Sequence, residues 1–227
     1  MARKFIGRER PNSVVVVIGL GRFGKSLALE LMKDGHTEVL GIDANADAVQ
    51  SVSGRLTHAV IADSTKEDAL RQLSVHESQR AVVGIGSDIE ASILTASVLV
   101  EMGIPAIWAK AISHSHARIL TQIGVHHVVR PEHDMGARVA HLVRGRMMDY
   151  IEFDDGFAMV KTTPPRETIG VRLGDTNIRQ KHGVTIVAVK RPGEGFTYAT
   201  ADTILHHDDM LIASGLIEDT ERFSELT

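Results

Sequence analysis

The sequence predicts an α/β protein in which a doubly wound parallel sheet is followed by a small α+β module. Three observations predict this architecture. Strand-like and helix-like segments alternate between residues 13 and 130, a glycine-rich turn joins the first strand to the first helix, and the alternation stops near residue 149. Single helices between successive strands are typical of parallel sheets.

The β-branched run at residues 14–19 predicts the first strand, and a helical pattern follows at 24–34. Further strands are expected at 38–43, 58–62, 81–86, 106–110 and 127–130, with helices near 45–53, 66–73, 88–102, 114–123 and 133–148. Glycines stand where several of these helices should end, as in common C-terminal caps. We therefore expect an N-terminal tail at 1–12, a nucleotide-binding domain at 13–148 and a small C-terminal domain at 149–227.

The small C-terminal domain has a different pattern of elements. Strands are expected at 150–153, 157–162, 184–190 and 210–213, and one helix at 175–182 that Gly183 ends. A mixture of strands with a single short helix predicts an α+β module.

The glycine-rich turn at residues 19–24 reads G-x-G-x-x-G and includes Phe23. Gly19 permits the tight turn, Gly21 lets the backbone approach a pyrophosphate, and Gly24 lets the helix pack closely on the strand. The free N–H groups at the start of the helix would face the phosphates. The motif therefore predicts a Rossmann-type nucleotide site.

An acidic residue follows the second strand at the spacing that this motif requires. Asp43 lies 19 residues after Gly24. A carboxylate there accepts hydrogen bonds from a ribose diol and repels a 2′-phosphate. The alternative is an ordinary glycine turn with Asp43 as an acidic helix cap.

Other polar residues follow the predicted strands at the edge where ligands bind in such sheets. Asp63 follows the third strand, Lys110 ends the fifth, and Glu132 follows the sixth. Arg22 lies inside the glycine turn, so Arg22 and Lys110 would bring two positive charges to the phosphates, which suits a triphosphate. The alternative is a solvated loop residue for Arg22 and ordinary surface charges for Lys110 and Glu132.

Composition excludes several function classes. The net charge of −4, with basic residues spread along the chain, argues against a nucleic-acid partner. The chain has no cysteine, which excludes disulfides, thiol catalysis and metal sites with cysteine ligands. Its twelve histidines lack the spacing of zinc sites, which argues against a histidine metal site. Neither a secretory leader nor an apolar run of about 18–20 residues is found, so a cytosolic protein is expected.

Several segments together resemble a known family, the KtrA/TrkA group of regulatory subunits of bacterial potassium uptake systems, which are built from RCK domains. The resemblance rests on residues 17–24, 58–62, 107–111 and 129–136 in the first domain. Residues 183–191 and 209–215 resemble the family's small C-terminal domain. The chain is as long as the single-RCK type, and it has Asp63 where Ktr-type sequences carry Asn.

The resemblance implies a non-enzymatic, cytoplasmic gating subunit that ATP and ADP, or NAD and NADH, would switch. It implies dimers that assemble into a ring, an octamer, beneath a membrane-embedded potassium channel subunit on the inner face of the membrane. Two alternatives remain open from the residues: an NAD-dependent oxidoreductase and a free-standing nucleotide sensor.

The resemblance also assigns roles to residues. It implies that Gly19, Gly21, Arg22, Phe23 and Gly24 form the phosphate loop, with Arg22 favouring a γ-phosphate.

Asp43 would bind ribose, Asp63 would lie near adenine, and Lys110 would approach the phosphates. Glu132 would help hold Mg²⁺, Ca²⁺ or Na⁺ beside the nucleotide. Some family members bind cyclic di-AMP in the C-terminal domain, for which Asn177 and Arg179 are candidates. The alternative is a helix with Asp175 as its N-cap and a solvated face.

Overall fold

The chain forms two compact units, Met1–Pro131 and Glu132–Thr227. The computed structural model describes residues 13–144 and 147–226. The predicted tail at 1–12 lies outside the described residues. The predicted domain boundary at residue 149 stays a prediction, and the structure groups the helix before it with the second unit.

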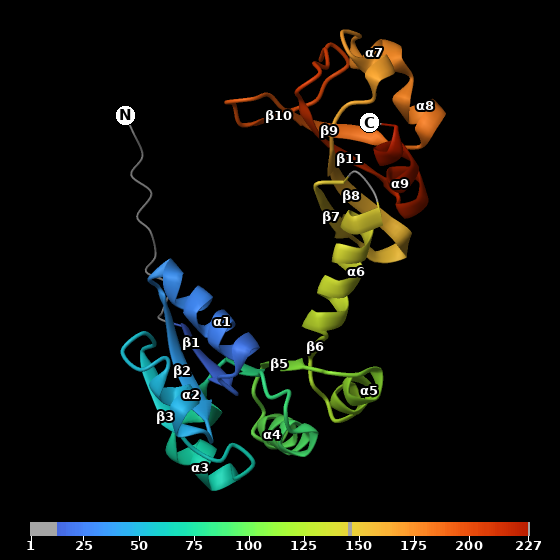
Figure 1. Cartoon of the computed structure of the whole chain (residues 1–227). Coiled ribbons are helices and arrows are strands. Elements are labelled where there is room, and N and C mark those ends of the chain that lie inside the picture. The colour runs from blue at the N-terminus through green and yellow to red at the C-terminus, as the bar shows by residue number, and fades with distance from the viewer. Residues whose placement is uncertain (1–12, 145–146, 227) are drawn as a thin grey trace, which may run out of the picture. The chain divides into compact units, whose positions relative to one another are not determined.

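The first unit contains a six-stranded sheet in which every pairing is parallel. The strand order is β3-β2-β1-β4-β5-β6. This order confirms the predicted doubly wound sheet (Figure 1). The strands are β1 (Ser13–Ile18), β2 (Thr37–Asp43), β3 (His58–Ile61), β4 (Arg80–Val83), β5 (Ala106–Lys110) and β6 (His127–Val129).

Helices cover both faces of this sheet, because alternate side chains of its strands point to opposite sides. One core contains Val15 and Val17 of β1 and Ala28 of α1. The other contains Val16 of β1 and Leu99 of α4. The helices of this unit are α1 (Arg22–Leu31), α2 (Ala46–Gln50), α3 (Glu67–Gln72), α4 (Ile89–Glu101) and α5 (His114–Gln122), with short 3₁₀ turns η1 (Met32–Asp34) and η2 (Val75–Glu77).

The order of strands fixes where a ligand can bind. The chain passes from β1 to β2 on one side and returns to β4 on the other side of β1. The carboxyl ends of β1 and β4 therefore lie side by side at the switch point of the sheet. The glycine turn follows β1 at this place.

The second unit contains α6 (Pro131–Arg144) except for its first residue, and a five-stranded sheet of order β10-β9-β11-β8-β7. All four pairings are antiparallel (Figure 1). The predicted α+β module is confirmed, although the sequence did not indicate β10 or α9. The elements are β7 (Asp149–Glu152), η3 (Asp154–Gly156), β8 (Phe157–Thr162), η4 (Arg166–Thr168), α7 (Leu173–Thr176), α8 (Ile178–His182), β9 (Thr185–Lys190), β10 (Phe196–Tyr198), β11 (Met210–Leu216) and α9 (Ile217–Glu225).

Side chains of α6 anchor this helix to the second unit. His141 stacks on the buried ring of Tyr150, and its Nδ1 lies 2.6 Å from Oε1 of Glu221 in α9. Arg138 pairs with Asp149 at the start of β7, which lowers the pKa of that carboxyl. These contacts explain why α6 belongs with the second unit.

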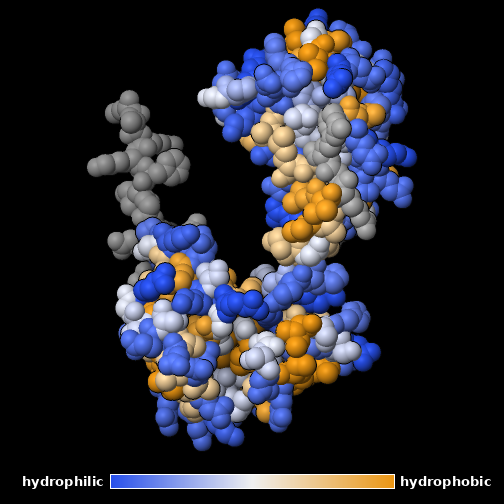
Figure 2. All heavy atoms as spheres, viewed as in Figure 1, coloured by the Kyte–Doolittle hydropathy of each residue, from blue (hydrophilic) through white to orange (hydrophobic). Residues whose placement is uncertain are grey.

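The other side of α6 carries apolar residues that nothing in the described part of the unit covers. Met135, Val139 and Val143 are 54%, 45% and 79% exposed. Their spacing of four residues places them on one face of the helix. Figure 2 shows hydrophobic atoms at the surface of α6. Exposed apolar patches of this kind mark interaction sites.

The single helix predicted at 175–182 is wrong. Two short helices, α7 and α8, occupy this region, and they meet at Asn177. Asn177 has φ 54° and ψ 26°, a left-handed conformation that interrupts a right-handed helix. Asp175, expected as an N-cap, lies inside α7. Among the described residues, no helix is long and apolar enough to cross a membrane.

Candidate functional site

The glycine turn follows β1 directly and leads into α1. Gly19 has φ +88° and its N–H donates to the carbonyl of Ile42 in β2, 2.8 Å away. A side chain at Gly24 would overlap the carbonyl oxygen of Gly19. A Cβ at Gly21 would meet no atom within 4 Å, so this backbone is open to an approaching group. The three glycines therefore have the geometry that a phosphate turn requires.

A second glycine segment, which the sequence reasoning missed, crosses this turn. A Cβ at Gly84, just after β4, would lie 2.9 Å from the carbonyl oxygen of Gly19 and 3.4 Å from Cα of Gly24. The N–H of Gly84 donates to the carbonyl of Ile18 at 2.7 Å. The backbones at Gly19, Gly24 and Gly84 therefore approach one another closely at the switch point, where a side chain on Gly24 or Gly84 would clash. The G-x-G pattern at Gly84 and Gly86, directly after a strand, is the signal that could have shown it.

The start of α1 is suited to an anion. No side chain caps this helix at Gly21, and its first turn contains no acidic residue. The N–H groups of the first turn and the positive end of the helix dipole therefore remain available to a negative group. Arg22, the first residue of the helix, is exposed. Phe23 is half-buried beside it.

Asp43 holds the glycine turn from the end of β2. Its Oδ2 accepts from the N–H of Leu20 at 2.6 Å, and its Oδ1 accepts from the N–H of Asn45 at 2.8 Å. Asn45, and not Asp43, caps α2. Asp43 is half-buried, so its carboxylate lies next to the turn and within reach of solvent.

Asp63 organises the loop after β3. Its Oδ1 accepts from both the backbone N–H and the hydroxyl of Thr65, and that hydroxyl lowers the pKa of the carboxyl. The next residue, Ser64, is buried, and its hydroxyl lies 2.8 Å from the hydroxyl of Thr95 in α4. This buried pair fixes the loop, and no local sequence pattern indicated it.

Lys110 lies at the end of β5 and is only 9% exposed. Its ammonium group is 5.8 Å from the centre of the Phe23 ring. A Cβ at Gly86 would lie 3.3 Å from the same nitrogen. Lys110 therefore lies beside the loop after β4 and near Phe23 at the start of α1, and its role toward phosphates stays a prediction. A buried ammonium group near open backbone N–H groups favours an anionic ligand.

Glu132 lies in the first turn of α6, in the second unit, and is exposed. The glycine turn, Asp43, Asp63 and Lys110 all lie in the first unit. No group of three or more histidine, aspartate or glutamate side chains suited to a metal ion is found among residues 13–144 and 147–226. The cation role of Glu132 stays a prediction.

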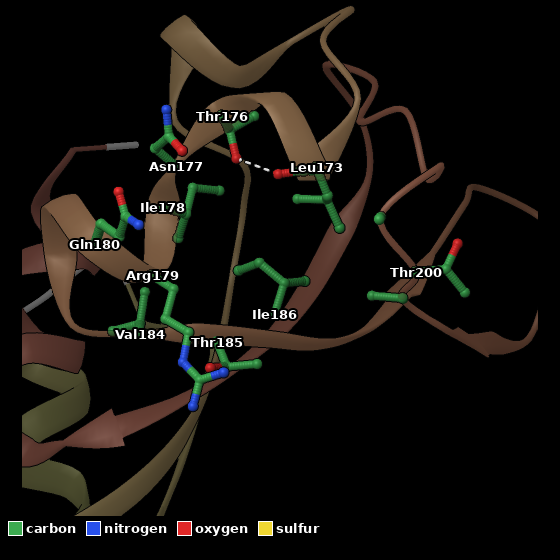
Figure 3. A pocket seen from close by; sticks show the side chains of 13 residues that line it. Leu173, Thr176, Asn177, Ile178, Arg179, Gln180, Val184, Thr185, Ile186 and Thr200 are labelled. Carbon is green, nitrogen blue, oxygen red and sulfur yellow. Dashed lines mark hydrogen bonds between the residues drawn. The ribbon is translucent and has the colours of Figure 1, made fainter.

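The second unit contains a cavity of about 500 Å³ between α7, α8, β9 and the segment after β10. Its lining includes Asn177 and Arg179, the two candidates for a second ligand. Figure 3 shows the apolar side chains of Leu173, Ile178 and Ile186 facing the cavity, and Arg179 at its border. The cavity therefore combines apolar walls with one guanidinium group, that of Arg179, and two amide groups, those of Asn177 and Gln180.

Comparison with known proteins gives matches over both units. The family model described as TrkA-N domain matches residues 15–131, and the model described as TrkA-C domain matches residues 157–227. Ktr system potassium uptake protein C of Bacillus subtilis is 39% identical over 92% of this chain and 95% of that protein. Ktr system potassium uptake protein A of the same organism is 37% identical over 93% and 96%.

Solved structures resemble the fold at lower sequence identity. The GsuK RCK domain superposes with a TM-score of 0.66 at 16% identity, over 94% of this chain and 48% of that one. The GsuK channel bound to NAD gives a TM-score of 0.51 at 21% identity, over 97% of this chain and 40% of that one.

Proposed function

Since this chain belongs to the TrkA-domain family of potassium uptake proteins, we propose that it is the nucleotide-binding regulatory subunit of a bacterial potassium uptake system. Its partner would be a membrane-embedded potassium channel subunit, at the cytoplasmic face of the membrane. The protein would act by changing shape with the bound nucleotide, without catalysing a reaction. The names of the Bacillus relatives support the transport role.

The observation that carries the nucleotide role is the site at the β1–β4 switch point. There, an uncapped helix start, an open backbone at Gly21 and the carboxylate of Asp43 adjoin each other. The first two suit phosphate oxygens, and Asp43 suits a ribose diol. That a solved structure of this fold holds NAD supports the same class of ligand.

We assign the phosphates to Gly19, Gly21, Arg22, Phe23 and Gly24, and the adenosine side to Asp43 and Asp63. Lys110 would face the phosphates from the β5 end. ATP is the ligand that the two cationic groups favour, because a triphosphate carries more charge than a pyrophosphate, and ADP would bind at the same site. NAD and NADH are the alternative at the same site.

Calorimetric titration with ATP, ADP and NADH tests this proposal. Arg22→Ala should weaken ATP binding by about 1–3 kcal/mol, which is the cost of a lost charge-assisted hydrogen bond, and should change ADP binding much less. Arg55→Ala, an exposed arginine of the same unit, is the matched control. Equal losses for ATP and ADP would remove the γ-phosphate role, and no binding of any of the three would refute the nucleotide site.

Two further ligands complete the proposal. Glu132 would hold Mg²⁺, Ca²⁺ or Na⁺ beside ATP, since hard cations prefer oxygen ligands.

The cavity at Asn177 and Arg179 would take cyclic di-AMP, whose phosphates suit a guanidinium group and whose bases suit apolar walls. Arg179→Ala should abolish binding of cyclic di-AMP without changing ATP binding. Binding that survives in this variant would reject the site.

A regulatory subunit of this kind should act as an oligomer. A nucleotide shifts a conformational equilibrium only by its differential affinity for the two states, and coupled copies add their contributions. The apolar face of α6 supports self-association. We expect dimers that assemble into a ring of eight, and a monomer in light scattering with and without ATP would contradict this.

A further inference from the structure

His116 is a buried histidine close to the proposed nucleotide site. It lies in the first turn of α5 and is 2% exposed. Its Nδ1 accepts a hydrogen bond from the backbone N–H of Ile112 at 3.4 Å. Burial lowers the pKa of His116, so the ring is neutral near pH 7. A neutral ring that accepts at Nδ1 carries its proton on Nε2.

The buried ring is not explained by packing alone. Its Nε2 has no hydrogen-bond partner within the described part of the chain. A buried polar group without a partner is destabilising, so an apolar side chain would fill the same place better. The Nδ1 contact with Ile112 is the interaction that only a polar residue supplies.

Ile112 belongs to the segment that carries Lys110. A Cβ at Gly86 would lie 3.3 Å from Nζ of Lys110 and 3.4 Å from Cγ2 of Ile112, so both residues cover the same glycine. Between them, the N–H of Ala111 donates to the carbonyl of Val129 at 2.8 Å. The segment is therefore tied to β6 through Ala111 and to α5 through His116.

We propose that His116 is a positioning residue of the nucleotide site. By fixing the backbone of Ile112, it holds Lys110, two residues earlier, with its ammonium group beside Gly86, where it would face the phosphates. This inference rests on the proposed nucleotide function. It adds a residue, His116, that does not contact the nucleotide but fixes the position of Lys110, which would contact it.

Two variants separate positioning from simple packing. His116→Phe keeps most of the ring volume but removes the acceptor, whereas His116→Asn keeps an acceptor near the place of Nδ1 but removes part of the ring. Affinity for ATP should fall about 3- to 10-fold in His116→Phe, the range for one lost hydrogen bond, and about 2-fold or less in His116→Asn. Thermal stability, in contrast, should be lower in His116→Asn than in His116→Phe, because the smaller asparagine leaves a cavity. His114→Phe, an exposed position on the same helix, is the control.

A double-mutant cycle with Lys110→Met shows whether the effect passes through Lys110. In the Lys110→Met background, His116→Phe should change ATP affinity less than 2-fold, since the group that it positions is gone. Losses that simply multiply would overturn the inference, as would parent-like ATP binding by His116→Phe or equal losses in both His116 variants. A parent protein that binds none of ATP, ADP and NADH would refute the proposed function, and this inference with it.

Discussion

The contact between Gly24 and Gly19 allows a sharp test of the glycine turn. A Cβ at Gly24 would overlap the carbonyl oxygen of Gly19, whereas real Cβ atoms keep at least 3.0 Å from such an atom. In Gly24→Ala, α1 must therefore move away from β1 by about 1 Å. Ala28, fully buried on the same helix, would lose its close packing on the sheet.

Overpacking of this kind costs about 1–3 kcal/mol in the free energy of unfolding. With a urea slope of about 2 kcal/mol per molar, the midpoint should fall by about 1 M. Trp108 is the only tryptophan, lies on β5 of the first unit and is 40% exposed, so its fluorescence reports the unfolding of that unit.

Gly21→Ala is the matched control for this experiment. Its Cβ would meet no atom within 4 Å and its φ of −64° suits alanine, so its urea midpoint should stay near that of the parent. The same Cβ would occupy the open side of the turn, and we expect at least a 10-fold loss of ATP affinity. If Gly24→Ala unfolds within about 0.5 kcal/mol of the parent, the close approach is not what requires glycine, and the reasoning is wrong.

Four other outcomes are expected. Asp43→Ala should lower the free energy of unfolding by about 1–3 kcal/mol, measured in urea, because the N–H of Leu20 loses its acceptor, and it should also weaken ATP binding. Burial lowers the pKa of His116 below 6.5, so at low pH the unfolded chain takes up the proton more readily than the folded protein. The free energy of unfolding of the parent should therefore decrease as the pH falls below about 6.5. In urea titrations, His116→Phe should lose less of this free energy than the parent between about pH 7.5 and 5.5. Val139→Asp should dissociate the oligomer, which light scattering would detect as a lower mass. An unchanged mass would show that the apolar face of α6 is not the self-association surface. Glu132→Gln should reduce the effect of Mg²⁺ on the ATP-bound assembly while ADP binding stays intact, and a parent-like response to Mg²⁺ would leave Glu132 as a helix-start residue.

The sheet could be predicted from sequence because its determinants are local. β-branched runs form the strands, and glycine alone permits the conformation at Gly19 and the close approach at Gly24. Asp43 could be predicted to lie beside the turn because the length of the β1-α1-β2 unit places the end of β2 next to the end of β1.

The features that escaped prediction depend on distant contacts or on weak local signals. Position 84 needs glycine because a Cβ there would come too close to the carbonyl oxygen of Gly19. Since Gly19 is far away in sequence, no periodicity reveals this contact. The three-residue β10 is too short to show alternation. Asn177 interrupts a good helical pattern because its side chain tolerates a left-handed backbone, which asparagine adopts only in some contexts.

Both carboxylate oxygens of Asp43 accept backbone hydrogen bonds, one of them from the glycine turn. The carboxylate of Asp43 fixes Leu20 in the turn through a hydrogen bond within the chain, so the protein itself sets the shape of the turn that the proposed nucleotide would meet. The part that ATP and ADP, the proposed ligands, have in common would meet this same turn, so the turn would not discriminate between them. Discrimination is left to the third phosphate and to the few groups that it touches, about 1–3 kcal/mol for one such contact. A change from 1:99 to 99:1 between two states requires about 5.5 kcal/mol. A single proposed site falls short of this amount, so a response to the ratio of ATP to ADP would become steep only if several copies changed state together.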